Sequence, residues 1–205
     1  MAREDGLQAE ENVNPYIALA DLAINLVLIL AFFIAAVNAM GRAGWEQVRY
    51  RDRQKEFRQS IVASLPIALR PYEHFGKHDP PGVQRWVFSE QRLFVPGTTR
   101  ITPGGRIGLV KFAGVLVKHR TLWRRVRVEG HTRPPINGSR DDWELSSARA
   151  AVVARILYAE GHIPPYNIAV AGRAGQNPID RSNPKDPRNE RVEILLEYAQ
   201  QETRE

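Results

Sequence analysis

The sequence predicts an α/β domain that follows a single membrane-spanning helix. Two patterns in the 205 residues lead to this prediction. The first is an apolar stretch over residues 17–37. The second is an alternation of strand and helix signals over about the last 130 residues. Strands and helices that alternate along a chain are typical of an α/β sandwich, here in the order βαβαβ, with the helices packed on one face of the sheet.

The predicted spanning helix occupies residues 15–40, after an acidic tail over residues 1–14. Within residues 17–37 the polar side chains are Asp21 and Asn25. At 1.5 Å per residue this stretch extends about 31 Å, which matches the roughly 30 Å hydrocarbon core of a bilayer. A cleaved signal peptide and a buried helix of a soluble protein are the alternatives. The acidic start argues against the first, and the length of the stretch argues against both.

Residues 41–65 are predicted to form a charged linker that continues as an amphipathic helix. An apolar residue recurs at every fourth position and gives this helix one apolar stripe, formed by Phe57, Ile61 and Leu65. The helix is expected to end at Pro66, because several more prolines follow. The sequence therefore predicts a domain over residues 66–200 and a short tail over residues 201–205.

Four stretches of this domain have the composition or the alternation of strands: residues 84–95, 122–130, 166–172 and 191–199. In the second of them, Val126 and Val128 are expected to face the core. Arg125, Arg127 and Glu129 alternate with these valines and are expected to face away from it.

Two helices are predicted between these strands. The first begins with Thr102 as its N-cap and Pro103 at the first helical position. The second, over residues 141–161, opens with Asp141 and Glu144 at the spacing of a capping box. Apolar spacing predicts the buried stripe of this second helix: Leu145, Ala148, Val152 and Ile156.

Composition and charge narrow the class of function. The chain has no cysteine, which excludes disulfides, thiolate nucleophiles and thiolate metal sites. The net charge is +6, and the excess is concentrated over residues 100–133, with nine Lys or Arg and one acidic residue. Nucleic acid, anionic lipid and an anionic cell-wall polymer are the partners that such a basic surface attracts.

No motif in the sequence supports an enzyme. His74 and His78 have a spacing that suits a metal on a helix, but Gly76 and the following prolines disfavour a helix there, and no metal site is predicted. No serine, histidine and aspartate combination has motif support, and no complete nucleotide-binding motif occurs.

Asp21 is the residue in the apolar stretch that needs a physical reason. An ionised side chain at the centre of a spanning helix costs on the order of 2.5–3.5 kcal/mol. Asn25 lies four residues later and therefore on the same face of the helix. Intramembrane carboxylates usually face a protein interior and mark an ion pathway, and burial suits them to repeated protonation. Asp21 and Asn25 are accordingly the predicted ion-translocating residues. An Asp that lies near the membrane surface without a function is the alternative.

Four motifs in the second half carry a family resemblance: GHTR at residues 130–133, WELSSARA at 143–150, AGRAGQNPI at 171–179 and NERVEI at 189–194. In order and spacing they resemble the OmpA-like peptidoglycan-binding domain, above all in its version from MotB-type stator proteins. The LAD sequence that ends in Asp21 is similar to the YAD of MotB-type helices. The whole chain thus resembles a MotB-type or ZorB-type subunit.

The resemblance implies a peptidoglycan-binding set of five residues: Arg133, Asp141, Asp142, Arg149 and Arg191. Arg149 occupies the position of the family arginine that holds a carboxylate of the stem-peptide diaminopimelate. Arg133 replaces the family aspartate that helps bind this ligand, so the two loop aspartates are expected to supply the missing acid. Glu190 replaces the first arginine of the family NRRVEI motif.

The resemblance also implies a function and a set of partners. It describes a B-type subunit of an ion-driven rotary motor, in which two copies of this chain lie inside a pentameric ring of an A-type polytopic membrane protein. The translocated species is H⁺ or Na⁺, no other cofactor is expected, and nucleic acid is not an expected partner. The motor is either a flagellar stator or the ZorB subunit of an anti-phage Zorya system.

The implied location is the bacterial inner membrane, with the N-terminus in the cytoplasm and the C-terminal domain in the periplasm. The dense arginines after residue 40 favour the opposite orientation under the positive-inside rule. A cell-wall tether without ion conduction is the alternative function, and a basic nucleic-acid binder is the weakest one.

Overall fold

The computed structural model describes residues 15–76, 79–135 and 142–199, with the backbone alone for residues 15 and 41–49. The chain divides into two compact units, Met1–Trp45 and Glu46–Glu205, which are described separately here. The first helix, α1 (Pro15–Ser64), contributes residues to both units.

In the first unit, the segment Tyr16–Met40 of α1 is long and apolar enough to cross a membrane. The large apolar side chains of this segment are exposed around the whole helix, Leu22 and Leu26 among them. A helix that is apolar on all sides needs apolar surroundings, either lipid or other helices.

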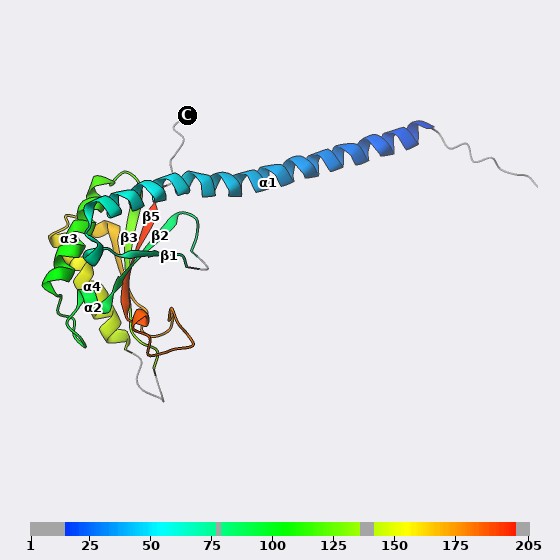
Figure 1. Cartoon of the computed structure of the whole chain (residues 1–205). Coiled ribbons are helices and arrows are strands. Elements are labelled where there is room, and N and C mark those ends of the chain that lie inside the picture. Colours follow the sequence, from blue (N-terminus) through cyan, green and yellow to red (C-terminus); the bar gives the residue numbers. More distant parts are fainter. Residues whose placement is uncertain (1–14, 77–78, 136–141, 200–205) are drawn as a thin grey trace, which may run out of the picture. The chain divides into compact units, whose positions relative to one another are not determined.

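The second unit contains a five-stranded mixed sheet with the strand order β1-β2-β5-β3-β4 (Figure 1). Its strands are β1 (Tyr72–His74), β2 (Val83–Ser89), β3 (Trp123–His131), β4 (Ile168–Gly172) and β5 (Arg191–Tyr198). β3 and β4 are parallel and are joined through a helix, whereas the other neighbours are antiparallel. The α/β prediction is confirmed. The sequence signals did not include β1, a three-residue edge strand in the proline-rich region.

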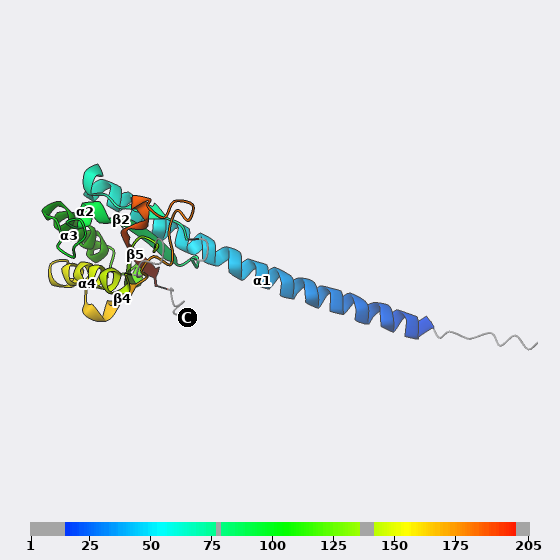
Figure 2. The same cartoon turned by 90° about the horizontal axis from the view of Figure 1, so that it is seen from below.

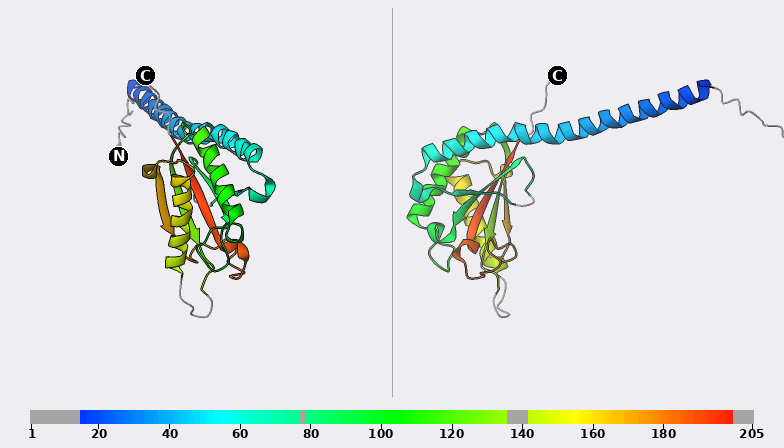
Figure 3. Two further views of the ribbon diagram at one scale, coloured as in Figure 1. Left: turned by 90° about the vertical axis from the view of Figure 1, so that its left-hand side faces the viewer. Right: turned by 45° about the vertical axis from the view of Figure 1, so that its right-hand side comes forward.

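The helices of this unit gather on one face of the sheet, as two views of the ribbon show (Figures 1 and 3). They are α2 (Glu90–Leu93), α3 (Pro103–Lys118) and α4 (Trp143–Ala159), together with the last turns of α1. Figure 2 shows α2, α3 and α4 from a second direction. Three short 3₁₀ turns, Ile67–Leu69, Pro165–Asn167 and Pro187–Asn189, complete the unit. α3 begins as predicted, since the Thr102 side chain accepts a hydrogen bond from the Gly105 amide at 2.9 Å.

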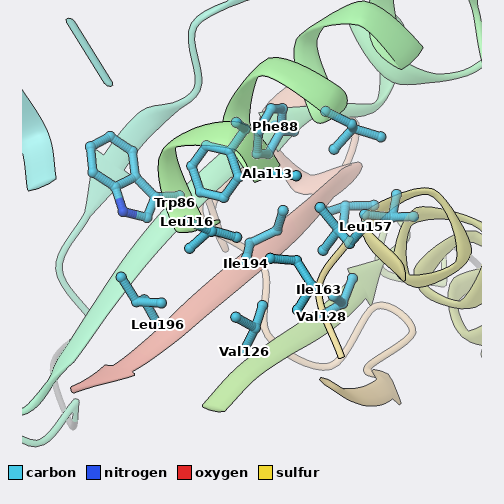
Figure 4. Close-up of a cluster of buried hydrophobic side chains, with 14 of the residues drawn as sticks. Trp86, Phe88, Ala113, Leu116, Val126, Val128, Leu157, Ile163, Ile194 and Leu196 are labelled. Atoms are coloured by element: carbon cyan, nitrogen blue, oxygen red, sulfur yellow. The ribbon is translucent and has the colours of Figure 1, made fainter. Parts of the chain in front are cut away.

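The core lies between this helical layer and the sheet. Alternate strand residues point into it, as Val126, Val128, Ile194 and Leu196 show in Figure 4. α4 can lie close to β3 because Gly130 has no side chain. A Cβ there would lie 2.0 Å from the Ser146 carbonyl oxygen.

The last turns of α1 belong to this core. Tyr50, Phe57, Ile61 and Leu65 are buried, and the Phe57 ring packs 5.9 Å from Trp86 and 6.1 Å edge-on from Phe112, between ring centroids. The predicted stripe of Phe57, Ile61 and Leu65 is therefore confirmed. The compact unit starts at Glu46, twenty residues before the start expected at residue 66, because this stripe packs against the sheet and α3.

The predicted stripe of α4 was wrong by about one residue. Ala148 is exposed and Leu145 and Val152 are only half-buried, although Ile156 is buried as expected. The side chains that face the core form a neighbouring stripe: Ser146, Arg149, Ala150, Val153 and Leu157. Two polar residues face inward because each finds a bonding partner there, a possibility that hydrophobic spacing alone does not consider. Asp142 is the N-cap, and Asp141 lies outside the described residues.

We expect Phe57→Ala to destabilise the second unit by about 3–5 kcal/mol, because it removes a fully buried ring from an aromatic cluster. Thermal and denaturant unfolding of the full chain in detergent, followed by tryptophan fluorescence, measures this loss. Val62→Ala is the matched control, since Val62 is exposed on the same helix. Equal stability of the two variants would contradict the assignment of these turns to the core.

Candidate functional site

Asp21 and Asn25 lie together on α1, as the sequence predicted. The Asn25 amide donates to the Asp21 carboxylate, with 3.4 Å between Nδ2 and Oδ1, and both side chains are exposed. A carboxylate and an amide thus form one polar stripe on a helix that is otherwise apolar. No side chain in the described part of the chain covers either of them.

Two of the five implied wall-binding residues, Arg133 and Arg149, lie at one end of the sheet. The register places both Ser89 of β2 and His131 of β3 opposite Arg191, the first residue of β5. The residues just beyond these strand ends therefore meet Glu190. The Glu90 amide donates to the Glu190 carbonyl oxygen at 3.1 Å, and Arg133 lies two residues past His131.

Arg133 and Glu190 form an ion pair, with 2.8 Å between Nη2 and Oε2. The side chains are 45% and 21% exposed, so the pair faces solvent. In the sequence these two residues are separate departures from the family pattern, and the structure shows that they are partners. The sequence contained a sign of this pairing. Arg133 stands where the family has an acid and Glu190 stands where it has an arginine, so the two positions still carry opposite charges.

Arg149 lies underneath this pair and is almost completely buried, with 2% of its side chain exposed. Its Nη2 donates to Glu90 Oε1 at 2.7 Å, its Nε donates to the Thr98 carbonyl at 3.1 Å, and its guanidinium lies over the Phe94 ring. Burial raises the pKa of Glu90, although the Arg149 charge opposes that shift. Sequence analysis missed Glu90, because nothing in the local sequence links it to a residue 59 positions later.

These four residues, Glu90, Arg133, Arg149 and Glu190, form a four-charge cluster that is neutral overall. The inner pair is shielded from water, and the outer pair is accessible. One guanidinium nitrogen, Nη1 of Arg149, is buried without a hydrogen-bond partner among the described residues. The cluster therefore exposes one carboxylate and one guanidinium group to a ligand, and the guanidinium group of Arg149 is buried beneath them.

The remaining implied residues lie elsewhere or outside the description. Arg191 is buried on the helix-free face of the sheet, where it donates to Glu193 and to the carbonyls of Asn189 and Asn177. It is therefore not brought together with Arg149. Asp142 is exposed at the start of α4, and Asp141 is not described. Asp142 has no ion pair with the cluster among the described residues.

The helix-free face of the sheet carries a network of ion pairs. Glu129 is paired with Arg127 and Arg173, and Glu193 is paired with Arg85 and Arg191. Burial alone would raise the pKa of Glu193, but the neighbouring His131 ring and the two arginines hold it well below its usual value. This arrangement stabilises the ionised form of the carboxylate.

Donor atoms of Glu129, His131 and Glu193 lie within 4.8 Å of one another and have the chemistry of metal ligands. Burial lowers the pKa of His131, which favours the neutral form of its ring, although the neighbouring glutamates oppose this shift. However, arginines already occupy both carboxylates, so a divalent cation would have to displace them. We assign this trio to the ion-pair network.

A serine, a histidine and a glutamate also meet between α1 and α3. Ser60 Oγ lies 2.8 Å from His119 Nε2, and Glu56 Oε1 lies 3.3 Å from His119 Nδ1. The order of contacts is that of nucleophilic catalysis, although the sequence holds no such motif. Phe57 packs edge-on against the same imidazole ring, so the contact fastens α1 to the end of α3.

Residues 93–191 match the OmpA family. This part of the chain is an OmpA-like domain. Solved structures share its fold. A MotB-like protein from Desulfovibrio vulgaris matches with a TM-score of 0.62 at 22% identity, over 77% of this chain and 99% of the other. The T6SS cell wall anchor from Pseudomonas aeruginosa matches with a TM-score of 0.54 at 24% identity, over 68% and 95% of the two chains.

Curated relatives match over a larger part of the chain than the OmpA-like domain alone. The uncharacterised protein YtxE of Bacillus subtilis is 30% identical over 74% of this chain and 63% of its own length. The truncated flagellar export/assembly protein LafU of Escherichia coli K12 is 28% identical over 57% of this chain and 56% of its own length. The chain therefore spans only about 60% of these relatives. Among these matches, LafU has a flagellar name and the Pseudomonas aeruginosa protein is a cell wall anchor.

The buried pair beneath the OmpA-like site has a testable energetic role. Arg149→Met should destabilise the domain by about 3–5 kcal/mol, because it leaves the Glu90 carboxylate buried without its partner. The double variant with Glu90→Met should recover most of this loss, since two apolar side chains replace the pair. Denaturant unfolding of the full chain in detergent measures both. A single variant as stable as the wild type would show that Glu90 is hydrated.

Proposed function

We propose that this chain is the B-type subunit of an ion-driven rotary membrane motor. Asp21 carries the ion, and Asn25 shares its polar stripe. The observation that carries this proposal is the carboxylate–amide pair on a membrane-length apolar helix, in a chain that also has an OmpA-like domain. The MotB likeness of the fold and the flagellar name of LafU support it.

The proposed assembly removes the free-energy cost of placing the Asp21 carboxylate in lipid. Two copies of α1 lie within a ring of an A-type polytopic subunit, where Asp21 faces protein and not lipid. The chain spans the inner membrane with its N-terminus in the cytoplasm and its OmpA-like domain in the periplasm. The translocated ion is H⁺ or Na⁺. A flagellar stator and a Zorya defence motor both have this design, and a wall tether without conduction is the alternative.

The proposed anchor is peptidoglycan, held at the outer pair of the four-charge cluster. In the family pattern an acid precedes an arginine at these positions, whereas here Arg133 faces Glu190. We infer that the carboxylate and the ammonium group of a zwitterionic stem peptide bind at positions exchanged relative to the family pattern. Arg133 holds a carboxylate and Glu190 holds an ammonium group. Arg149 acts from below as a buried cation.

We expect Asp21→Asn to leave insertion and assembly intact and to reduce ion conduction to the background of empty vesicles. The amide has nearly the same shape but does not exchange a proton. Ion uptake by vesicles that contain this chain and its A-type partner measures the effect. Asp21→Glu is the matched control and should retain part of the activity. Wild-type conduction by the Asn variant would contradict Asp21 as the ion carrier, and a lack of conduction by the wild type would favour the wall tether.

Arg133→Ala should weaken binding to the wall about tenfold or more, because one charge-assisted hydrogen bond to a ligand contributes about 1.5–3 kcal/mol. Arg133→Asp alone places two acids side by side and should also fail to bind. The double variant Arg133→Asp with Glu190→Arg rebuilds the pair with the acid and the arginine at the positions they have in the family, and it should restore binding. Co-sedimentation of the full chain in detergent with purified peptidoglycan measures all three variants, with unfolding curves as a check on folding. Unchanged binding by Arg133→Ala would exclude this pair as the wall site.

A further inference from the structure

The end of the sheet next to Tyr50 carries a groove that neither ion conduction nor wall binding uses. Its walls come from the start of β2, the start of β3, the end of β5 and α1, and its volume is about 460 Å³. We call it the basic groove, after its lining residues Tyr50, Gly82, Arg124, Arg125, Arg127 and Glu197. It lies at the opposite end of β3 from the four-charge cluster, which begins beyond His131.

The charge of the basic groove is positive. Three arginines face one glutamate across it. Glu197 is 3.4 Å from Arg124, and Arg127 is paired with Glu129. Arg125 is exposed and has no ion pair among the described residues. The basic stretch that stands out in the sequence thus provides a cluster of exposed guanidinium groups, which suits phosphate oxygens.

The covalent chain keeps this groove close to the membrane that the proposed span crosses. Tyr50, which lines it, follows Met40 by ten residues, all within α1. Ten residues reach at most about 35 Å even when fully extended. The groove therefore stays within reach of the headgroup layer at the end of the span, where anionic headgroups attract basic side chains.

An exposed aromatic residue lies beside the groove. Phe75 is 71% exposed, and it lines a neighbouring hollow together with Arg51. This hollow and the basic groove share Pro80, Pro81 and Val83. An apolar ring among cationic side chains is the composition of a surface that lies in the headgroup region of a bilayer.

We propose that this end of the domain binds the phosphate headgroups of anionic lipids in the membrane that the chain spans. Arg124 and Arg125 contact the phosphates, and Phe75 enters the interface. The contact holds the domain against the bilayer. It rests on the proposed membrane span, and it is independent of ion conduction and of wall binding.

The absence of cysteine allows a direct test on the full chain, because one introduced cysteine takes a single fluorophore. Pro80→Cys places the label at the groove, and Ala148→Cys places a control label on the exposed side of α4. The chain is reconstituted in nanodiscs whose lipids carry a headgroup quencher. One set contains phosphatidylcholine alone, and the other also contains phosphatidylglycerol.

The label at residue 80 should be quenched more strongly with phosphatidylglycerol, and the label at residue 148 should not. The excess should vanish near 1 M salt, where the Debye length is about 3 Å. Arg124→Gln and Arg125→Gln should each lower the ratio of bound to unbound domain about fivefold, and Phe75→Ser should lower it further. Arg155→Gln, a change of an exposed arginine on α4, is the matched control and should have no effect.

Each other outcome contradicts the proposal in a distinguishable way. A chain that does not co-elute with the nanodiscs contradicts the membrane span itself. A chain that co-elutes but shows equal quenching in both lipids contradicts the headgroup contact alone. Duplex DNA that abolishes the excess quenching, at a phosphate concentration matched to the lipid, would identify the groove as a nucleic-acid site instead.

Discussion

The pairing of β5 with both β2 and β3 is the interaction on which the rest of the domain depends. β5 is the last strand in the chain, yet it lies in the middle of the sheet and contributes Val192, Ile194 and Leu196 to the core. Its register sets which residues of β2 and β3 meet at each end. The four-charge cluster forms where these strands end next to Glu190, and the basic groove forms at the other end, beside Tyr198. A shift of one residue would exchange the core face and the charged face of this strand.

The domain contains several buried ion pairs. Buried ion pairs carry a desolvation cost of several kcal/mol per ion, so they are weak evidence for stability alone. The domain nevertheless buries Glu90 with Arg149 in the helical layer, and Glu129 and Glu193 with arginines on the other face. In each case the geometry provides a partner within hydrogen-bonding distance. The exposed Arg133–Glu190 pair differs, because solvent screens it and a ligand can replace either contact.

The first unit differs, because no basic side chain is paired with Asp21 among the described residues. The side chains of Asp21 and Asn25 bond only weakly to each other and are otherwise exposed. An apolar helix of this kind needs lipid or other helices around it, whereas the OmpA-like domain has a core of its own. This difference is the reason that the proposed function places Asp21 among partner helices.

The sequence by itself determined most of the secondary structure and the polar stripe of α1. Periodicity, a proline after a threonine N-cap and the four-residue spacing of Phe57, Ile61 and Leu65 are local signals, and local hydrogen bonding and packing obey them. Family motifs singled out Arg133, Arg149 and Glu190, but they did not reveal which charges touch. Only the tertiary structure decided that Arg133 pairs with Glu190, that Arg149 is buried against Glu90, and that the turns after Trp45 belong to the core. The first two contacts join residues that are 57 and 59 positions apart, and the third joins α1 to strands and helices later in the chain. No local pattern encodes such contacts.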